Sequence, residues 1–139
     1  MYAPRWAKAA VIYFVVGVGF GLYMSMTENY QFPSLHAHIN LLGWASMALI
    51  AAFHRVFPEL EEHQLANVNF WLYQIAFPVM MLGLFLVSID RGEIGGPLAG
   101  FGGMLTGLAV LLFAFSVIGA LQGSENTRRH AAMPRVRIR

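Results

Sequence analysis

Four apolar segments, each about twenty residues long, constrain this chain more than any other feature of its sequence. They cover about residues 7–26, 35–57, 68–89 and 98–121, and short polar stretches separate them. At 1.5 Å per residue, a helix of about 20 residues crosses a hydrocarbon core of roughly 30 Å. The sequence therefore predicts an all-α fold, a bundle of four transmembrane helices in an integral membrane protein.

The composition agrees with a membrane location and excludes several kinds of chemistry. Only 12% of the 139 residues are charged, about half the share in an average soluble domain. The chain has no cysteine, which excludes disulfides, thiolate metal ligands and thiol nucleophiles. Residues 1–121 are predicted to form the membrane domain. Residues 122–139, with five arginines and no apolar run, are predicted to be a mobile, basic cytoplasmic tail.

The basic residues predict the orientation. Eight of the nine lie at one side of the predicted helices, and Arg91 is the exception. Since loops rich in Lys and Arg remain in the cytoplasm, both termini are expected to be cytoplasmic in a multi-pass protein of the inner membrane. Basic residues in these places set topology, so the expected partner is lipid and not nucleic acid.

Two histidines, His36 and His38, open the second apolar segment about one turn below the outer surface. An ionisable side chain in hydrocarbon is costly and usually marks a functional site. Residues two apart lie about 200° apart around a helix, so the two rings face different neighbourhoods and cannot grip one ion from one face. Neutral imidazole is a good ligand for iron, copper and zinc.

Two interpretations of this pair follow. In the structural one, each histidine hydrogen-bonds to a neighbouring helix, for instance through Asn40, Gln74 or Thr106. Contacts of that kind contribute about 1 kcal/mol each, which is little for two intramembrane histidines. In the functional one, His36 of one subunit faces His38 of the next in a symmetric oligomer, and a flat cofactor lies between them.

The other histidines are predicted to have structural or solvated positions. His63 lies in a loop and His130 in the tail. His54 returns to the helix face of His36 but lies about 27 Å further along the axis, so the two cannot share a metal. We expect His54 to cap the helix or snorkel to the inner interface. A second cofactor near the inner surface is the alternative.

Three further patterns predict how the helices pack. Small residues recur every four positions in the first segment and in the fourth, which favours close helix contacts on those faces: Gly17 and Gly21, then Ala99, Gly103 and Gly107. Several aromatic residues are expected in belts at the membrane surface: Trp6, Tyr13, Tyr30, Trp71 and Tyr73. The acidic stretch from Glu59 to Glu62 is expected to be a solvated turn.

The string His-Ala-His-Ile-Asn-Leu-Leu-Gly-Trp at residues 36–44 resembles the His-x-His helix of the catalytic subunit of haem-copper oxidases. It is also similar to the His-Ala-His stretch of the NnrS family of haem-associated membrane proteins. In the oxidases the two histidines ligate two different haems from opposite sides of one helix. The twelve helices of that subunit form three four-helix units around a pseudo-threefold axis, and this chain resembles one such unit.

The resemblance implies haem b with iron ligated by His36 and His38, and a homo-oligomer, specifically a trimer. Arg91 is the candidate partner of the haem propionates, since guanidinium pairs well with carboxylate. Its alternative role is an ion pair with Asp90 or Glu93. Trp44 is expected to line the haem pocket, together with a set of other apolar residues: Phe77, Met80, Met81 and Met104. Copper is a less favoured metal.

The chain also departs from the oxidase pattern. No other predicted helix supplies the three further histidines of a copper site, and no acidic residue is embedded for a proton path. We therefore expect a b-type cytochrome that transfers electrons, with a quinol or a cytochrome as redox partner, and not an enzyme. The alternatives are a haem or copper carrier, a sensor of nitric oxide or oxygen, and a non-haem accessory subunit of a respiratory complex.

Overall fold

The computed structural model describes residues 1–62 and 65–132, and side chains as far as residue 123. Within these residues the chain is all-helical, and four helices are long and apolar enough to cross a membrane. The elements are α1 (Ala3–Met26), α2 (Pro33–His38), the π-helix η1 (Ile39–Ser46), α3 (Met47–Val56), α4 (Glu59–Glu62), α5 (Leu65–Ser88) and α6 (Gly92–Ala132). The predicted all-α fold of a multi-pass membrane protein is confirmed.

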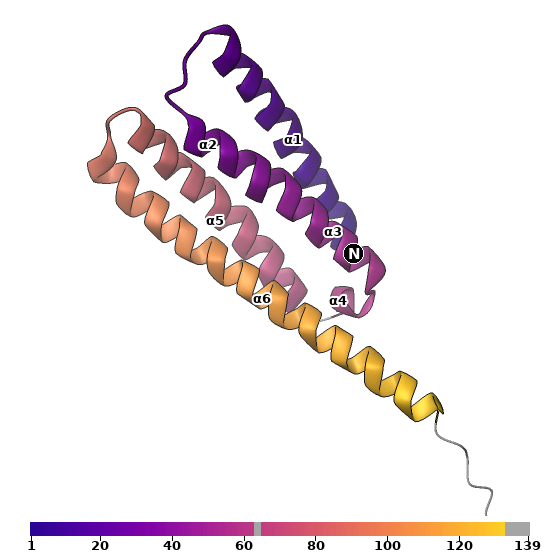
Figure 1. Cartoon of the computed structure of the whole chain (residues 1–139). Helices are drawn as coiled ribbons and strands as arrows, with labels where there is room; N and C mark the ends of the chain where they lie inside the picture. Colours follow the sequence, from indigo (N-terminus) through magenta and orange to yellow (C-terminus); the bar gives the residue numbers. More distant parts are fainter. Residues whose placement is uncertain (63–64, 133–139) are drawn as a thin grey trace, which may run out of the picture.

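The four long helices form two antiparallel hairpins (Figure 1). In the first, α1 lies along the second span, which consists of α2, η1 and α3 in succession; in the second, α5 lies along α6. At one end the hairpins are joined by Phe32, whose ring stacks on Phe85 at a centroid distance of 5.8 Å. Beside this pair, Gln31 Nε2 donates a hydrogen bond of 2.5 Å to the Ser88 carbonyl. We call this the histidine end, because His36 and His38 begin the second span there.

The second hairpin is held together by backbone contact at glycines. A Cβ atom at Gly83 would lie 2.2 Å from the backbone nitrogen of Ala99, and one at Gly102 would lie 2.4 Å from that of Met80. The predicted contact face of Ala99, Gly103 and Gly107 is only partly right. Ala99 is in tight contact, but nothing lies within 4 Å of a Cβ at Gly107. Because a helix has 3.6 residues per turn, residues spaced every four positions move gradually away from one face. The residues of α6 in tight contact are therefore spaced three or four positions apart.

The second span contains a π-helix, which the sequence pattern did not predict. It begins directly after His38 and covers eight residues, Ile39–Ser46. Such segments are rare in proteins and occur frequently at functional sites. In this one, the Leu42 carbonyl accepts a hydrogen bond of 3.1 Å from the hydroxyl of Tyr73 in α5. The π-helix thus joins the two hairpins at mid-depth.

Two of the aromatic residues expected at the membrane surface are instead in the core. Trp6 is 1% exposed and Tyr73 is fully buried, and their rings meet edge to face at a centroid distance of 5.3 Å. Tyr30 and Trp71 are exposed, as an interfacial location requires. The position of an aromatic residue along the helix does not predict whether it is buried or exposed, because that depends on the helix face on which it lies.

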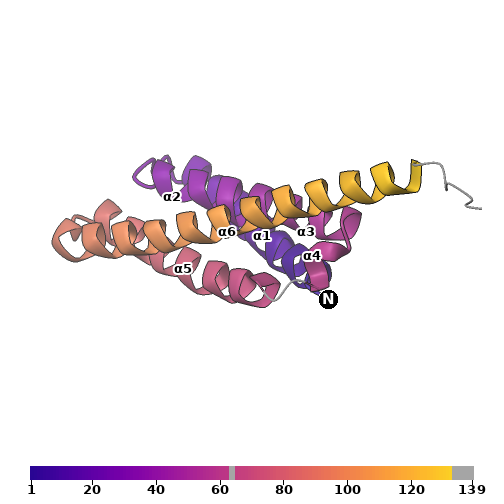
Figure 2. The same ribbon diagram turned by 90° about the horizontal axis from the view of Figure 1, so that it is seen from below.

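The last helix is longer than predicted. It begins at Gly92 and continues to Ala132, so the segment from residue 122 that was expected to be mobile starts as helix. No proline interrupts the chain between Pro97 and Pro134, and the intervening Ala, Leu, Gln and Arg residues favour helix. Figure 2 shows α6 extending beyond the rest of the molecule. The remainder of the predicted tail, residues 133–139, lies outside the described residues.

The acidic stretch is not simply a solvated turn, because Glu61 binds the start of α1. Its carboxylate accepts hydrogen bonds from the backbone N–H groups of Tyr2 and of Ala3, the latter at 2.6 Å. The Met1 amino group lies 3.3 Å from the same carboxylate. The first N–H groups of a helix lack partners within the helix, and an anion there also interacts favourably with the helix dipole. Glu61 thereby fastens α4 to α1.

This contact predicts a pH-dependent stability. Burial raises the pKa of the Glu61 carboxyl, but the two N–H donors and the Met1 ammonium outweigh it, so the pKa is lowered. A carboxyl with a lowered pKa stabilises the fold above its unfolded pKa and loses that effect as the pH falls through its folded pKa. Glu61→Gln should reduce the free energy of unfolding at neutral pH by about 1 kcal/mol.

The measurement is unfolding of the detergent-solubilised protein by SDS at several pH values. The difference between wild type and Glu61→Gln should shrink as the pH falls through the lowered pKa of Glu61, because the carboxylate of the wild type then becomes protonated. Glu62→Gln is the matched control, since Glu62 lies in the same turn and is exposed. Equal effects of the two substitutions would contradict the assigned role of Glu61.

Candidate functional site

The ring of His38 is held by a hydrogen bond to the backbone of its own helix. His38 is the last residue of α2, and its Nδ1 lies 2.7 Å from the Ser34 carbonyl oxygen of the preceding turn. A carbonyl only accepts hydrogen bonds, so Nδ1 carries the proton and donates it. No described residue hydrogen-bonds to Nε2, whose lone pair is therefore left for a ligand. A carbonyl on one ring nitrogen is the usual arrangement behind a metal bound to the other.

His36 faces in a different direction, toward α1 of its own chain. A Cβ atom at Gly21 would lie 2.7 Å from the His36 Cε1, so the imidazole fits there because residue 21 has no side chain. Asn40 donates a hydrogen bond of 2.9 Å to the His36 carbonyl, and its Nδ2 lies 3.4 Å from the His36 Nδ1. A Cβ at Gly17 would clash with the Asn40 amide in the same way. Gly17 thus accommodates the Asn40 amide, and Gly21 accommodates the His36 ring.

The structural interpretation of the two histidines is not supported in the described part of the chain. Thr106 donates its hydroxyl proton to the Gly102 carbonyl of its own helix, and Gln74 donates to the Met47 sulfur. Asn40 is on the same helix as both histidines. Neither His36 nor His38 hydrogen-bonds to a neighbouring helix among these residues, so interhelical bonding does not account for the pair.

Among the described residues, neither Trp44 nor Arg91 has a hydrogen bond or a ring contact with a histidine. The Trp44 ring lies on the first hairpin against Phe14 at a centroid distance of 4.7 Å, and it is 38% exposed. Arg91 is exposed in the turn between α5 and α6, at the histidine end. It forms no ion pair among the described residues, so the alternative role with Asp90 or Glu93 is not observed. Its guanidinium is free to bind an anion from outside the chain.

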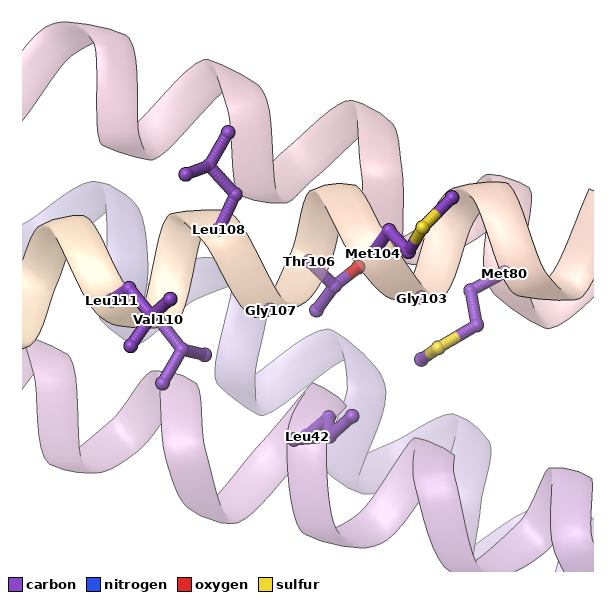
Figure 3. Close-up of a pocket in the computed structure, with 9 residues that line it drawn as sticks. All are labelled: Leu42, Met80, Gly103, Met104, Thr106, Gly107, Leu108, Val110 and Leu111. Atoms are coloured by element: carbon purple, nitrogen blue, oxygen red, sulfur yellow. The ribbon is translucent and has the colours of Figure 1, made fainter.

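An apolar groove of about 580 Å³ opens between the second span and α6. Figure 3 shows its walls, in which Leu42 faces the α6 side chains and Met80 projects from α5. Two residues predicted to line a haem pocket, Met80 and Met104, line this groove. Phe77 is instead fully buried in the core. None of the histidines whose side chains the structure describes lines the groove, but His38 precedes Leu42 by four residues and so lies about one turn above it on the same side of the span.

His54 is not a capping or snorkelling residue. It is 6% exposed, and its ring lies near those of Tyr2 and Phe113, at centroid distances of 6.4 and 6.1 Å. Snorkelling would bring the polar ring to solvent, but Leu60 of α4 covers this end of α3. The sequence did not predict this burial. Of the other histidines, His63 lies outside the described residues and the side chain of His130 is not described.

Among the described residues, no group of three or more His, Asp or Glu side chains converges as a metal site would require. What the site offers is a single oriented imidazole at the histidine end, a second imidazole on another side of the same helix, and an apolar groove below. Comparison with protein-family models, curated proteins and solved structures found no match for this chain. The fold and site define a four-helix, multi-pass membrane protein with a histidine pair at the start of its second span.

Proposed function

We propose that this protein is a membrane b-type cytochrome that transfers electrons, with haem b ligated by His36 and His38 at the interfaces of a homotrimer. The observation that carries the proposal is the hydrogen bond from His38 Nδ1 to the Ser34 carbonyl, because it leaves Nε2 as a fixed lone pair in the membrane. The resemblance of residues 36–44 to the His-x-His helix of haem-copper oxidases supports the same assignment.

The residues at this end fit the needs of a haem. Iron requires an unprotonated ring nitrogen, which His38 presents, and the macrocycle requires apolar surroundings, which Met80, Met104 and their neighbours in the groove supply. The propionates require a cation, and Arg91 is unpaired at the histidine end. A copper site is less well supported, since it would need several converging ligands from the protein itself.

The histidine geometry favours an interface between subunits. Because His36 faces α1 while His38 lies on another side of the helix, one chain cannot direct both rings at one iron. His36 and Gly21 both remain partly exposed, so a second copy can approach the His36 ring there. Cyclic repetition of that contact gives a closed oligomer with one site per interface, and the resemblance to the three-unit oxidase subunit favours three copies.

Haem b bound in this way supplies reversible one-electron transfer. The protein's part is to hold the iron with both imidazoles, to neutralise the propionates with Arg91 and to exclude water with the groove. If His36 and His38 both hold the iron, no coordination site would be left for a substrate, so the proposed function is electron transfer with a quinol or a cytochrome and not catalysis.

The charge distribution supports a location in the inner membrane with both termini in the cytoplasm. Arg5, Lys8 and Arg55 are exposed at the end opposite the histidines, and Arg91 is the single basic residue at the histidine end. Positive residues are retained on the cytoplasmic side. The histidine end would then face an extracytoplasmic electron acceptor or donor.

The test is an optical spectrum of the detergent-purified protein, oxidised and reduced, with extracted haem quantified per chain. We expect the sharp reduced bands of six-coordinate haem b at about one haem per chain. A colourless protein after expression with supplemented haem would refute the proposal. A five-coordinate spectrum would indicate a carrier or gas sensor, in which His36 does not ligate.

Gly21→Ala tests the role of the His36 pocket. The added methyl group would lie 2.7 Å from the His36 ring, so the ring must shift, and we expect loss of the six-coordinate reduced spectrum with a fall in haem content. Gly19→Ala is the matched control, because a Cβ at Gly19 meets nothing within 4 Å. An unchanged spectrum in Gly21→Ala would show that the observed position of His36 is not its ligating position.

A further inference from the structure

A small cavity lies at the end of the molecule opposite the haem site proposed above, within the hydrophobic interior. It measures about 10 Å³ and is lined by His54, Asn69, Ser116 and apolar neighbours. His54 belongs to the second span, and the other two polar residues belong to α5 and α6. The cavity is therefore a place where polar side chains from both hairpins meet.

Two of these side chains have buried polar atoms without a partner. His54 and Asn69 are each only 6% exposed. His54 Nδ1 and Asn69 Oδ1 are inaccessible and have no hydrogen-bond partner among the described residues. An unpaired polar atom in a low-dielectric interior costs about 1–3 kcal/mol. Two unpaired atoms beside one cavity indicate a shared ligand that satisfies both.

The remaining hydrogen bonds specify what that ligand must do. Asn69 Nδ2 donates to the Ala109 carbonyl at 2.8 Å, which fixes the amide so that its Oδ1 is the acceptor left over. Ser116 Oγ donates to the Leu112 carbonyl at 2.9 Å, so its free lone pairs can only accept. The ligand must therefore offer two protons to these oxygens and form a third bond to His54.

We propose that this cavity binds a single structural water that joins His54, Asn69 and Ser116. One water donates its two protons to Asn69 Oδ1 and Ser116 Oγ and accepts a third hydrogen bond from His54 Nδ1–H. Three bonds are typical of a buried water, and a cavity of about 10 Å³ is the size at which one water fits. Because a water has only two protons, full satisfaction requires the His54 tautomer with its proton on Nδ1.

The water connects the two hairpins, which otherwise meet at few polar contacts. At the histidine end they are linked through Gln31 and Ser88, and at mid-depth through Tyr73 and Leu42. The water would provide the polar link at the opposite end. It also accounts for an ionisable residue in a membrane span that no cofactor needs, and it does not depend on haem binding.

The experiment is NMR of the full-length protein in nanodiscs, labelled with ¹⁵N-histidine, with the His54 signals assigned by their absence in His54→Phe. We expect a protonated Nδ1 with a cross-peak to water that Asn69→Leu abolishes. Asn67→Leu is the matched control, since Asn67 is exposed on the same helix, and it should leave the cross-peak unchanged. An unprotonated Nδ1, or a protonated Nδ1 without a water cross-peak, would refute the proposal.

Thermal unfolding provides a second test that does not depend on NMR. Asn69→Leu and His54→Phe should each lower the Tm, and the double variant should lose less than the sum of the two single effects, because both substitutions break the same water-bridged group. Groups that act independently give additive effects. Additive losses in Tm would show that His54 and Asn69 share no ligand.

Discussion

His38→Ala is expected to remove the proposed haem from the protein almost completely. The ring of His38 is the one that the structure orients for ligation, with Nδ1 bound to the Ser34 carbonyl and Nε2 free. Under the proposed function, the loss of this ring would remove one of the two residues that would hold the iron. Since losing a partner that merely orients a ligand already costs 10- to 100-fold in metal affinity, losing the ligand itself should lower the haem content by at least about tenfold.

The measurement is the haem-to-chain ratio of the purified variant together with its reduced spectrum. His36→Ala should lower the haem-to-chain ratio to the same extent if both residues ligate one iron across an interface. His54→Gln is the control, because His54 lies near the opposite end of the second span, and its haem-to-chain ratio should equal that of the wild type. A full six-coordinate spectrum in either the His36 or the His38 variant would contradict the shared-ligand arrangement.

Gly83→Ala is expected to destabilise the protein strongly, because it forces α5 and α6 apart. The added Cβ would lie 2.2 Å from the backbone nitrogen of Ala99 and 2.6 Å from its Cα. These are backbone atoms of α6, so the strain cannot be relieved by rotating a side chain, and the two helices must separate. Overpacking of a tight interior typically costs 1–3 kcal/mol and sometimes more, and we expect about 3 kcal/mol for this substitution.

The comparison variant is Gly100→Ala, because a Cβ there meets nothing within 4 Å. Alanine favours helix over glycine by about 1 kcal/mol, so this control should be neutral or stabilising. Unfolding of both variants in mixed SDS and detergent micelles measures the difference. If Gly83→Ala proves as stable as Gly100→Ala, α5 and α6 do not pack at the observed distance.

The number and approximate limits of the membrane spans follow from sequence alone, because only a long apolar helix can carry about twenty consecutive apolar residues through lipid. The same holds for the different surroundings of His36 and His38, which result from a rotation of about 100° per residue. In both cases the information is local: it depends on length, on hydropathy and on the spacing along one helix.

Contacts between segments distant in sequence were decided by tertiary structure. The burial of Trp6, Tyr73 and His54 depends on which helix face meets the neighbouring helices, and the hydropathy of the sequence does not predict that face. The bond between Glu61 and the start of α1 joins residues almost sixty positions apart. Likewise, only the packing of α5 against α6 determines which glycines lie against the backbone of the other helix. Gly102 does so, and Gly107 does not.

The surroundings of the histidines depend partly on the sequence of one helix and partly on the packing of several. That His36 and His38 face different neighbourhoods is a property of the helix, and it was predicted from their spacing. That Gly21 of α1 accommodates the His36 ring, and that His54 and Asn69 leave two unpaired atoms beside one cavity, depends on how the helices pack. The physical reason is that a helix fixes directions around its own axis, whereas only the packing of helices determines what lies in each direction.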